Sequence, residues 1–327
     1  TTENQVTLNV TSQKGVDTQF TSADLTLSLD DFSQRIINPA MAVLAAAIEA
    51  DAFSMALDVY NAVNNIGNVI SFKNTLQARK ILNDNLAPMD GSRSIILNTQ
   101  DNVDLVDALK GLFQDSSEIK AQYRDGVMGH TAGFEFSENT LLPTQTTGTA
   151  LSATTYTVNG ANQTGSAVTV ATGSTTFKKG DIVTLAGCFR VHPETKTVLG
   201  DLQQFVVTAD YAGGGGNLAI SPAIVTSGGT QNVSASPTNG GAVTKVGGAS
   251  AVYKPSLAFH KDAFTFATAD LVLPKGVDMA SRAVMDGISM RLVRQYDINY
   301  DRFPVRLDVL YGYQTLRAQL ACRILSN

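Results

Sequence analysis

The sequence predicts an α+β protein whose body carries an inserted small β-barrel or sandwich domain. Three features of the 327 residues indicate this fold. Residues 40–60 form a long apolar stretch with helical spacing, helical and strand-like runs mix without regular β-α-β units, and the composition changes abruptly near Pro143. A chain of this length is expected to form about two domains and to bury a sizeable core.

Residues 5–20 have the pattern of a long β-hairpin. Apolar and polar residues alternate along its first half, as in a half-buried strand. Residues 12–15 then predict a turn, and a second extended run follows at 16–20. Because an isolated hairpin is only marginally stable in water, we expect something else, such as a neighbouring subunit, to cover it.

The strongest helical signal covers residues 40–60. Ahead of it, residues 28–31 have the pattern of a capping box, and Pro39 either kinks the element or starts its main part. As a helix the stretch would be about 30 Å long, and residues 64–67 predict its end. The stretch is therefore predicted to be a long, rigid structural helix. One apolar stripe follows its face: Met41, Leu44, Ile48, Met55 and Val59.

The segment before Pro143 mixes helices and strands. Helices are predicted at 72–85 and 103–113, and a short apolar strand at 94–98. This order lacks the regular crossover connections of a doubly wound sheet. The acidic side chains of residues 84–125 are interpreted as solvated helix faces.

Residues 145–250 have a different composition, with 17 of the 27 glycines and only 9 of the 53 charged side chains. Short β-prone runs are separated by turn-forming Gly and Asn, which predicts a separate small barrel or sandwich. Disorder is the alternative, strongest for 213–216 and 226–250. The β-prone runs are 156–158, 167–170, 181–185, 204–208 and 218–221.

The host fold resumes after Tyr253 with an apolar run at 257–266, and residues 279–286 predict a short turn or helix. A hairpin loop with charged residues at its tip is predicted at 297–302, between the first two of three final strands. Those strands are 289–296, 304–311 and 318–325.

Composition and charge exclude several classes of protein. The chain has no Trp, 2 Cys and 3 His, which argues against a disulfide scaffold and a multi-His metal enzyme. Its net charge of −5 is concentrated in residues 1–142, which carry 9 basic and 18 acidic side chains, so bulk attraction to nucleic acid is not expected. The longest apolar run, 40–48, is far short of the ~20 residues of a membrane span.

Catalytic and metal-binding patterns are missing from the sequence. None of His130, His192 and His260 lies near a nucleophile elbow, so a hydrolytic triad is not predicted. Cys188, His192 and Glu194 lack a fourth ligand. Cys322 is predicted to be a buried thiol. Whether Cys188 and Cys322 form a disulfide is left undecided by the sequence. We therefore expect no catalytic, cofactor or metal residue, and no enzyme.

Three stretches resemble the major coat proteins of tailed double-stranded DNA phages, which have the HK97-like fold. QKGV at 13–16 and FTSADLTLS at 20–28 are similar to the returning strand of the family's extended loop and the start of its spine helix. LAFHKDAF at 257–264 is similar to the strand after the insertion, and residues 297–312 are similar to the peripheral-domain hairpin. FKKGD at 177–181 resembles the inserted β domain of P22-type coat proteins.

The resemblance implies a division of the chain, in which the family's amino-terminal arm has no counterpart. Whether the arm is cleaved, disordered or omitted stays open. The implied parts are the extended-loop hairpin 1–27, the spine helix and peripheral domain 28–70, the axial domain 71–143 and 255–287, the inserted β domain 144–254, the peripheral-domain hairpin 288–312 and the final axial strand 313–327.

The resemblance also implies a function. Copies would assemble into pentamers and hexamers of an icosahedral phage head, with a scaffolding protein, a portal and packaged DNA as partners that need no sequence-specific binding and no membrane. Assembly would take place in the host bacterial cytoplasm, with the hairpin lying across a neighbour. The alternative is a β-rich phage decoration or adhesin-type protein. The inter-subunit contact candidates are Lys14, Asp17, Asp297, Asp301 and Arg302.

Overall fold

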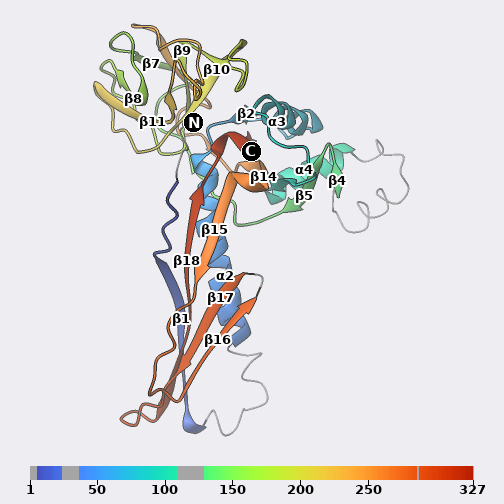
Figure 1. Ribbon diagram of the computed structural model, residues 1–327, viewed down its shortest axis with the longest axis vertical. Coiled ribbons are helices and arrows are strands. Elements are labelled where there is room, and N and C mark those ends of the chain that lie inside the picture. Colours follow the sequence, from blue (N-terminus) through green and yellow to red (C-terminus); the bar gives the residue numbers. More distant parts are fainter. Residues whose placement is uncertain (1–5, 24–36, 110–128, 286, 327) are drawn as a thin grey trace. The chain divides into compact units, whose positions relative to one another are not determined.

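The computed structural model describes residues 6–23, 37–109, 129–285 and 287–326. The chain divides into two compact units, each assembled from separated stretches of sequence (Figure 1). Each unit has an apolar core of its own. Unit 1 comprises Thr1–Met55 and Phe264–Leu316, and unit 2 comprises Ala56–Ala263 and Arg317–Asn327.

Unit 1 is built on a five-stranded antiparallel sheet. Its strands are β1 (Ser12–Thr21), β15 (Phe264–Ala269), β16 (Met279–Met285), β17 (Ile288–Arg294) and β18 (Arg302–Thr315). The order is β1-β18-β17-β16, and β15 pairs with β18 beyond the part that meets β17. Because β1 and β18 keep one register over ten residues, the amino-terminal strand is an integral edge of this sheet.

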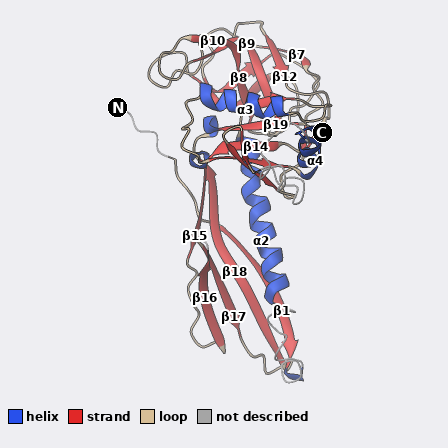
Figure 2. Ribbon diagram, turned by 90° about the vertical axis from the view of Figure 1, so that its right-hand side faces the viewer, coloured by secondary structure: helices blue, strands red, loops and turns tan. Residues whose placement is uncertain are grey.

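The helix α2 (Asn38–Phe53) packs along one face of this sheet (Figure 2). Pro39 stands in its first turn, where a missing N–H costs nothing, so the proline starts the helix rather than kinking it. Alternate residues of β18 point toward the helix and the intervening ones point away. The shared core consists of Leu44, Ile48, Leu307, Val309 and Tyr311.

Two sequence predictions for unit 1 are wrong. Residues 12–15 form no turn, since β1 runs straight through them, and the hairpin predicted at 5–20 does not form over the described residues of that range. The stretch 279–286 is not a turn or helix, because residues 279–285 pair with β17 as β16. The long helix predicted at 40–60 is confirmed within two residues at each end, since α2 continues directly into the 3-10 helix η3 (Ser54–Asp58), and residues 62–64 then form a strand. The predicted capping box at 28–31 lies outside the described residues.

Unit 2 contains a mixed six-stranded sheet in the order β2-β19-β14-β3-β5-β4. The pairs β19–β2 and β3–β5 are parallel and the others are antiparallel. The strands are β2 (Ala62–Asn64), β3 (Arg93–Leu97), β4 (His130–Thr131), β5 (Phe134–Glu138), β14 (Ser256–His260) and β19 (Ala321–Leu325).

Two helices accompany this mixed sheet, α3 (Phe72–Asp84) and α4 (Thr99–Leu109). The prediction of a helix at 72–85 is confirmed, and it begins at a capping box between Ser71 and Asn74. The strand predicted at 94–98 is confirmed as β3, whereas the helix predicted at 103–113 starts earlier. Two 3-10 helices, η4 (Lys261–Ala263) and η5 (Ala318–Leu320), adjoin β14 and β19.

A second six-stranded sheet in unit 2 has the order β7-β12-β9-β10-β11-β8. Its two end strands are joined by an isolated bridge between Val158 and Val170, so the sheet closes around a core of buried side chains. All five β-prone runs lie wholly or partly within its strands, and disorder is wrong for the part of 226–250 that forms β12. The strands are β7 (Ala153–Thr157), β8 (Gly165–Val170), β9 (Ile182–Val191), β10 (Val198–Val207), β11 (Gly216–Ile224) and β12 (Ala242–Lys245).

Buried contacts join this closed sheet to the mixed sheet. The Gln204 side chain accepts a hydrogen bond from Ala62 N at 2.7 Å and donates one to Ala62 O at 3.1 Å. Arg323 Nη2 donates to Gly180 O at 3.0 Å. Between the two sheets, β6 (Gln145–Thr146) pairs with β13 (Val252–Tyr253). These bonds explain why both sheets fall into one compact unit.

The prediction from run length that no segment could cross a membrane needs a correction. Among the described residues, one helix, Asn38–Asp58, is long and apolar enough to do so by length and composition, with a mean hydropathy of 1.6. Alanines between the larger apolar residues raise its hydropathy without producing one long unbroken run. In unit 1 its Leu44 and Ile48 belong to the core against β18.

Candidate inter-subunit surface

The sheet face turned away from α2 carries a row of three charged residues on β18, β17 and β16, with a glycine of β1 beside them. The register places Gly15 opposite Asp308, Asp308 opposite Arg291, and Arg291 opposite Arg282. Directly opposed residues of antiparallel strands share a face of the sheet. A Cβ at Gly15 would lie 3.0 Å from Asp308 Cβ, so the glycine leaves room for the carboxylate beside it.

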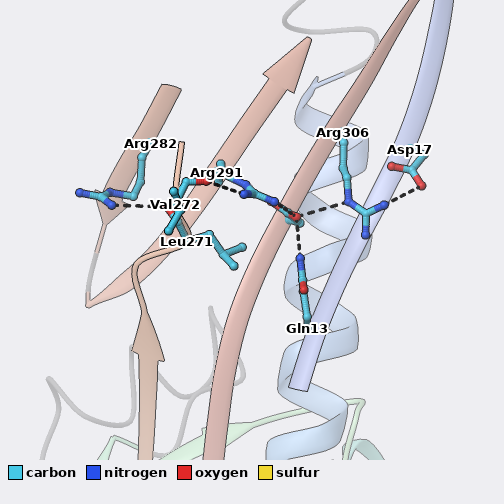
Figure 3. A network of polar contacts seen from close by, with 8 residues as sticks. Gln13, Asp17, Leu271, Val272, Arg282, Arg291 and Arg306 are labelled. Atoms are coloured by element: carbon cyan, nitrogen blue, oxygen red, sulfur yellow. Dashed lines mark hydrogen bonds and ion pairs between the residues drawn. The ribbon is translucent and has the colours of Figure 1, made fainter. Parts of the chain in front are cut away.

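Asp308 is fully buried at the centre of this polar face. Figure 3 shows the labelled Gln13, Arg291 and Arg306 side chains pointing toward one another across the strands. Arg291 donates to both carboxylate oxygens, from Nε at 2.9 Å and from Nη2 at 2.6 Å. Gln13 Nε2 donates at 2.9 Å and Arg306 Nε at 3.3 Å. Burial is the largest single cause and raises the pKa of Asp308. The hydrogen bonds from Arg291 and Gln13 together outweigh it, so the pKa lies below its ordinary value of 3.8.

The network reaches both edges of the sheet. At the β1 edge, Arg306 Nη1 contacts Asp17 Oδ2 at 3.5 Å. At the β16 edge, Arg282 Nη2 contacts Asp270 at 3.2 Å. Between them, Arg291 Nη1 donates to Val272 O at 2.6 Å, which holds the segment before β16 over the polar face. Each edge thus holds an ion pair, in which the edge strand β1 supplies the acidic residue and the edge strand β16 the basic one.

Lys14 lies on the opposite face, the one that carries α2. Its Nζ is 2.6 Å from Asp51 Oδ2, and Tyr311 OH donates to the same oxygen at 2.5 Å. Burial raises the pKa of Asp51, but the hydrogen bonds from Lys14 and Tyr311 lower it below its ordinary value. Lys14 therefore ties β1 to α2 within the chain.

The loop between β17 and β18, together with the first residue of β18, holds the other three predicted contact residues. Asp297 and Arg302 form an ion pair at 3.2 Å, and the Arg302 guanidinium lies 4.5 Å from the centre of the Tyr300 ring. Asp301 accepts hydrogen bonds from Ser22 and, at 3.1 Å, from Tyr296 OH. The tip is not only charged, since Ile298 is 80% and Tyr300 71% exposed.

Sequence reasoning missed Arg291, Arg306 and Asp308. Their alternation with Leu307 and Val309 was the available signal, because it marks one strand face as polar. Asp17 lies beside these residues on the polar face. Asp297, Asp301 and Arg302 lie together at the loop before β18. Lys14 belongs to neither group.

The catalytic and metal candidates lie in unit 2 and do not converge. In the residues that the structure describes, no three His, Cys, Asp or Glu side chains are grouped to hold a metal ion. His260 is buried and contacts Asp90 at 3.1 Å. Both cysteines are free, so the disulfide left open by the sequence does not form. Burial raises the pKa of Cys188 to about 11. The pKa of Cys322 is raised to about 12, and burial is the largest cause.

One acidic residue contradicts the interpretation of 84–125 as solvated helix faces. Asp101 is fully buried, and it accepts hydrogen bonds from Ser256 Oγ at 2.5 Å and from Ser326 Oγ at 2.7 Å. Burial raises its pKa as the largest cause. It fastens α4 to β14 and to the chain end, which is a structural role.

The ion pairs of the unit 1 sheet hold its charged side chains against one another across neighbouring strands. The family model described as "P22 coat protein - gene protein 5" matches residues 1–323. The chain therefore belongs to the P22 coat protein family. It is a major capsid protein, whose copies assemble into a shell in the virion head.

Solved structures give matches over nearly the whole chain. The structure of Mycobacterium phage Che8 is 13% identical, with a TM-score of 0.48, covering 99% of this chain and 76% of that one. The capsid of cyanophage P-SCSP1u is 10% identical, with a TM-score of 0.45 and coverages of 99% and 78%. The mature capsid of bacteriophage PhiM1 is 9% identical, with a TM-score of 0.42 and coverages of 98% and 72%. No curated protein matches the sequence.

Proposed function

We propose that copies of this chain build an icosahedral phage head from pentamers and hexamers, with the HK97-like subunit fold, around packaged double-stranded DNA. The observation that carries the proposal is the match to the coat protein family over residues 1–323. In this proposal α2 is the spine helix and the closed sheet of unit 2 is the inserted β domain of residues 144–254. Unit 1 supplies the peripheral surface through which subunits meet.

Five residues are proposed to contact neighbouring subunits: Lys14, Asp17, Asp297, Asp301 and Arg302. Support is uneven among them. The Asp17 side chain is 68% exposed, and the loop that carries Asp301 also exposes Ile298 and Tyr300, as an interface would require. Lys14 is already paired with Asp51, so its share in a contact would be indirect.

The partners in this proposal are other copies of the chain, a scaffolding protein, a portal and the packaged DNA. Assembly takes place in the host bacterial cytoplasm, without a membrane, and the chain acts as no enzyme. The composition supports one of these points, because the net charge of −5 does not favour tight binding of DNA to the wall.

The proposal is tested by expressing the full chain in bacteria, alone and with the scaffolding protein of its own phage. We expect closed shells in negative-stain micrographs and sedimentation far faster than that of the 34.6 kDa subunit. A monodisperse monomer in both arms would contradict the proposal and revive the decoration-protein alternative, which the family match does not favour. Spirals or open sheets would contradict the icosahedral head.

A further inference from the structure

The sheet of unit 1 ends in two strands with unpaired outer edges in the part of the chain that the structure describes. Over residues 12–19, β1 forms its ladder with β18 alone, and β16 forms its ladder with β17 alone. A regular exposed edge is a template for another strand, and proteins usually cover or blunt it. β1 has neither a bulge nor a proline in its ten residues. Its edge is therefore competent to pair.

We propose that β16 of one copy pairs with the outer edge of β1 of a second copy, so that the sheets of neighbouring subunits join into one. The inference rests on the proposed function, because it names the surfaces through which copies of this capsid protein meet. It commits to another copy of the chain because the family's subunits assemble with their own kind.

The strand directions allow this junction. Each of the pairs β1–β18, β18–β17 and β17–β16 is antiparallel, so β16 runs opposite to β1 in the same sheet. A second copy placed beside the first in the same orientation therefore brings its β16 antiparallel to β1. The alternation continues across the junction without inverting either subunit. Such a head-to-tail contact generates rings when its rotation closes.

Charge also matches across the proposed junction. On the face turned away from α2, Asp17 is the charged residue of β1 and Arg282 is the charged residue of β16. Their side chains are 68% and 36% exposed. Within one copy they stand three strand spacings apart, about 14 Å, and cannot meet. Between copies the same two side chains come onto neighbouring strands of one face.

Other edge pairings bring like charges together. A junction of β1 with β1 places Asp17 near a second Asp17, and a junction of β16 with β16 does the same with Arg282. Like charges across neighbouring strands are destabilising, and opposite charges are stabilising. Of the three possible junctions, the one between β1 and β16 is the one that these charges favour.

A charge swap tests the junction. Asp17→Lys and Arg282→Asp each place like charges across it, and we expect either to reduce the assembled fraction at least about tenfold. The double variant D17K/R282D restores opposite charges, and we expect assembly within about twofold of wild type. Inside each copy the double variant replaces both native ion pairs, Asp17 with Arg306 and Arg282 with Asp270, by pairs of like charge. Rescue can therefore come only from contact between copies.

The control is Asp201→Lys in unit 2, whose side chain is 69% exposed, like that of Asp17. We expect it to assemble as wild type, and thermal unfolding of each subunit verifies folding. If wild type forms shells but the double variant does not recover, the inference is wrong and the proposed function stands. If wild type forms no shells in either arm of the expression test, the proposed function itself fails.

Amide hydrogen exchange of the wild-type protein tests the junction independently and needs no variant. Unassembled subunits should exchange outward amides of β1 and β16 rapidly, and these amides should become at least about tenfold slower in shells. Amides of β1 that are already protected in the unassembled subunit would show that the chain covers its own edge. Unchanged exchange in shells would show that no strand pairs there. Either result overturns the inference.

Discussion

Asp308 controls the stability of the polar face because its buried carboxylate compensates two guanidinium groups. Asp308→Asn removes that charge and leaves Arg291, only 17% exposed, without its ion-pair partner. We expect this substitution to lower the free energy of unfolding of the subunit, measured in urea, by about 2–3 kcal/mol. Asp17→Asn is the matched control, since it removes an exposed partner of Arg306, and it should cost no more than about 0.5 kcal/mol. Equal losses would contradict the central role of Asp308.

The same carboxylate predicts a dependence of stability on pH. Since its pKa in the folded protein lies below the ordinary 3.8, the folded state holds the ionised form more tightly than the unfolded chain does. The stabilisation is therefore complete above the unfolded pKa and is lost as the pH falls through the folded pKa. Urea unfolding between pH 6 and pH 2 should show wild type and Asp308→Asn converging at the acid end. A constant difference between them would contradict this origin.

At the scale of elements, α2 depends on a narrow stripe of contacts. Leu44 is 2% exposed and packs in the core with β18, whereas Val43 beside it is 63% exposed. Leu44→Ala should lower the free energy of unfolding by about 3 kcal/mol. Val43→Ala removes apolar atoms from the same helix and should change it by less than about 0.5 kcal/mol. Chemical denaturation of the two variants checks the contrast, and similar losses would mean that the helix packs through another face.

The element that sequence reasoning misjudged most clearly is β1. Its residues 12–15 contain polar side chains and Gly15, a composition typical of a turn. In the structure Gly15 allows β1 to lie close to β18, because a Cβ at this position would meet Asp308 Cβ at 3.0 Å and Leu307 O at 3.1 Å. The reason lies almost three hundred residues away in the sequence, which no local pattern could reveal. β16 was missed similarly, since Ala, Met and Arg favour helices and pairing with β17 overrides that preference.

Local patterns succeeded where local physics decides the structure. The helix α3 begins at its own capping box, and the runs inside 145–250 became strands because Gly and Asn turns separate short β-prone segments. The candidate surface was only partly predictable. Asp17, Asp301 and Arg302 could be picked out as charged residues at strands and turns, but Asp308 and Arg291 acquire their roles from register across β17 and β18.

At the scale of the whole molecule, charge governs the relation to DNA. The chain carries 24 basic and 29 acidic side chains. Several arginines of unit 1 are bound to carboxylates: Arg282, Arg291, Arg294, Arg302 and Arg306. Binding to duplex DNA without sequence preference depends on cations that displace counterions from phosphates. These five guanidinium groups are therefore already paired with carboxylates, and we expect the subunit to bind duplex DNA weakly.

We expect the purified subunit to bind a fluorescent 30-base-pair duplex more weakly than about 100 µM at ~100 mM salt, measured by fluorescence anisotropy. Oligolysine serves as the positive control for the assay. Because the net charge of −5 leaves little attraction for salt to screen, lowering the salt to ~20 mM should strengthen any residual binding only slightly. Micromolar affinity with a steep loss on adding salt would show a basic surface that the net charge of −5 conceals. That result would contradict the expectation of weak DNA binding.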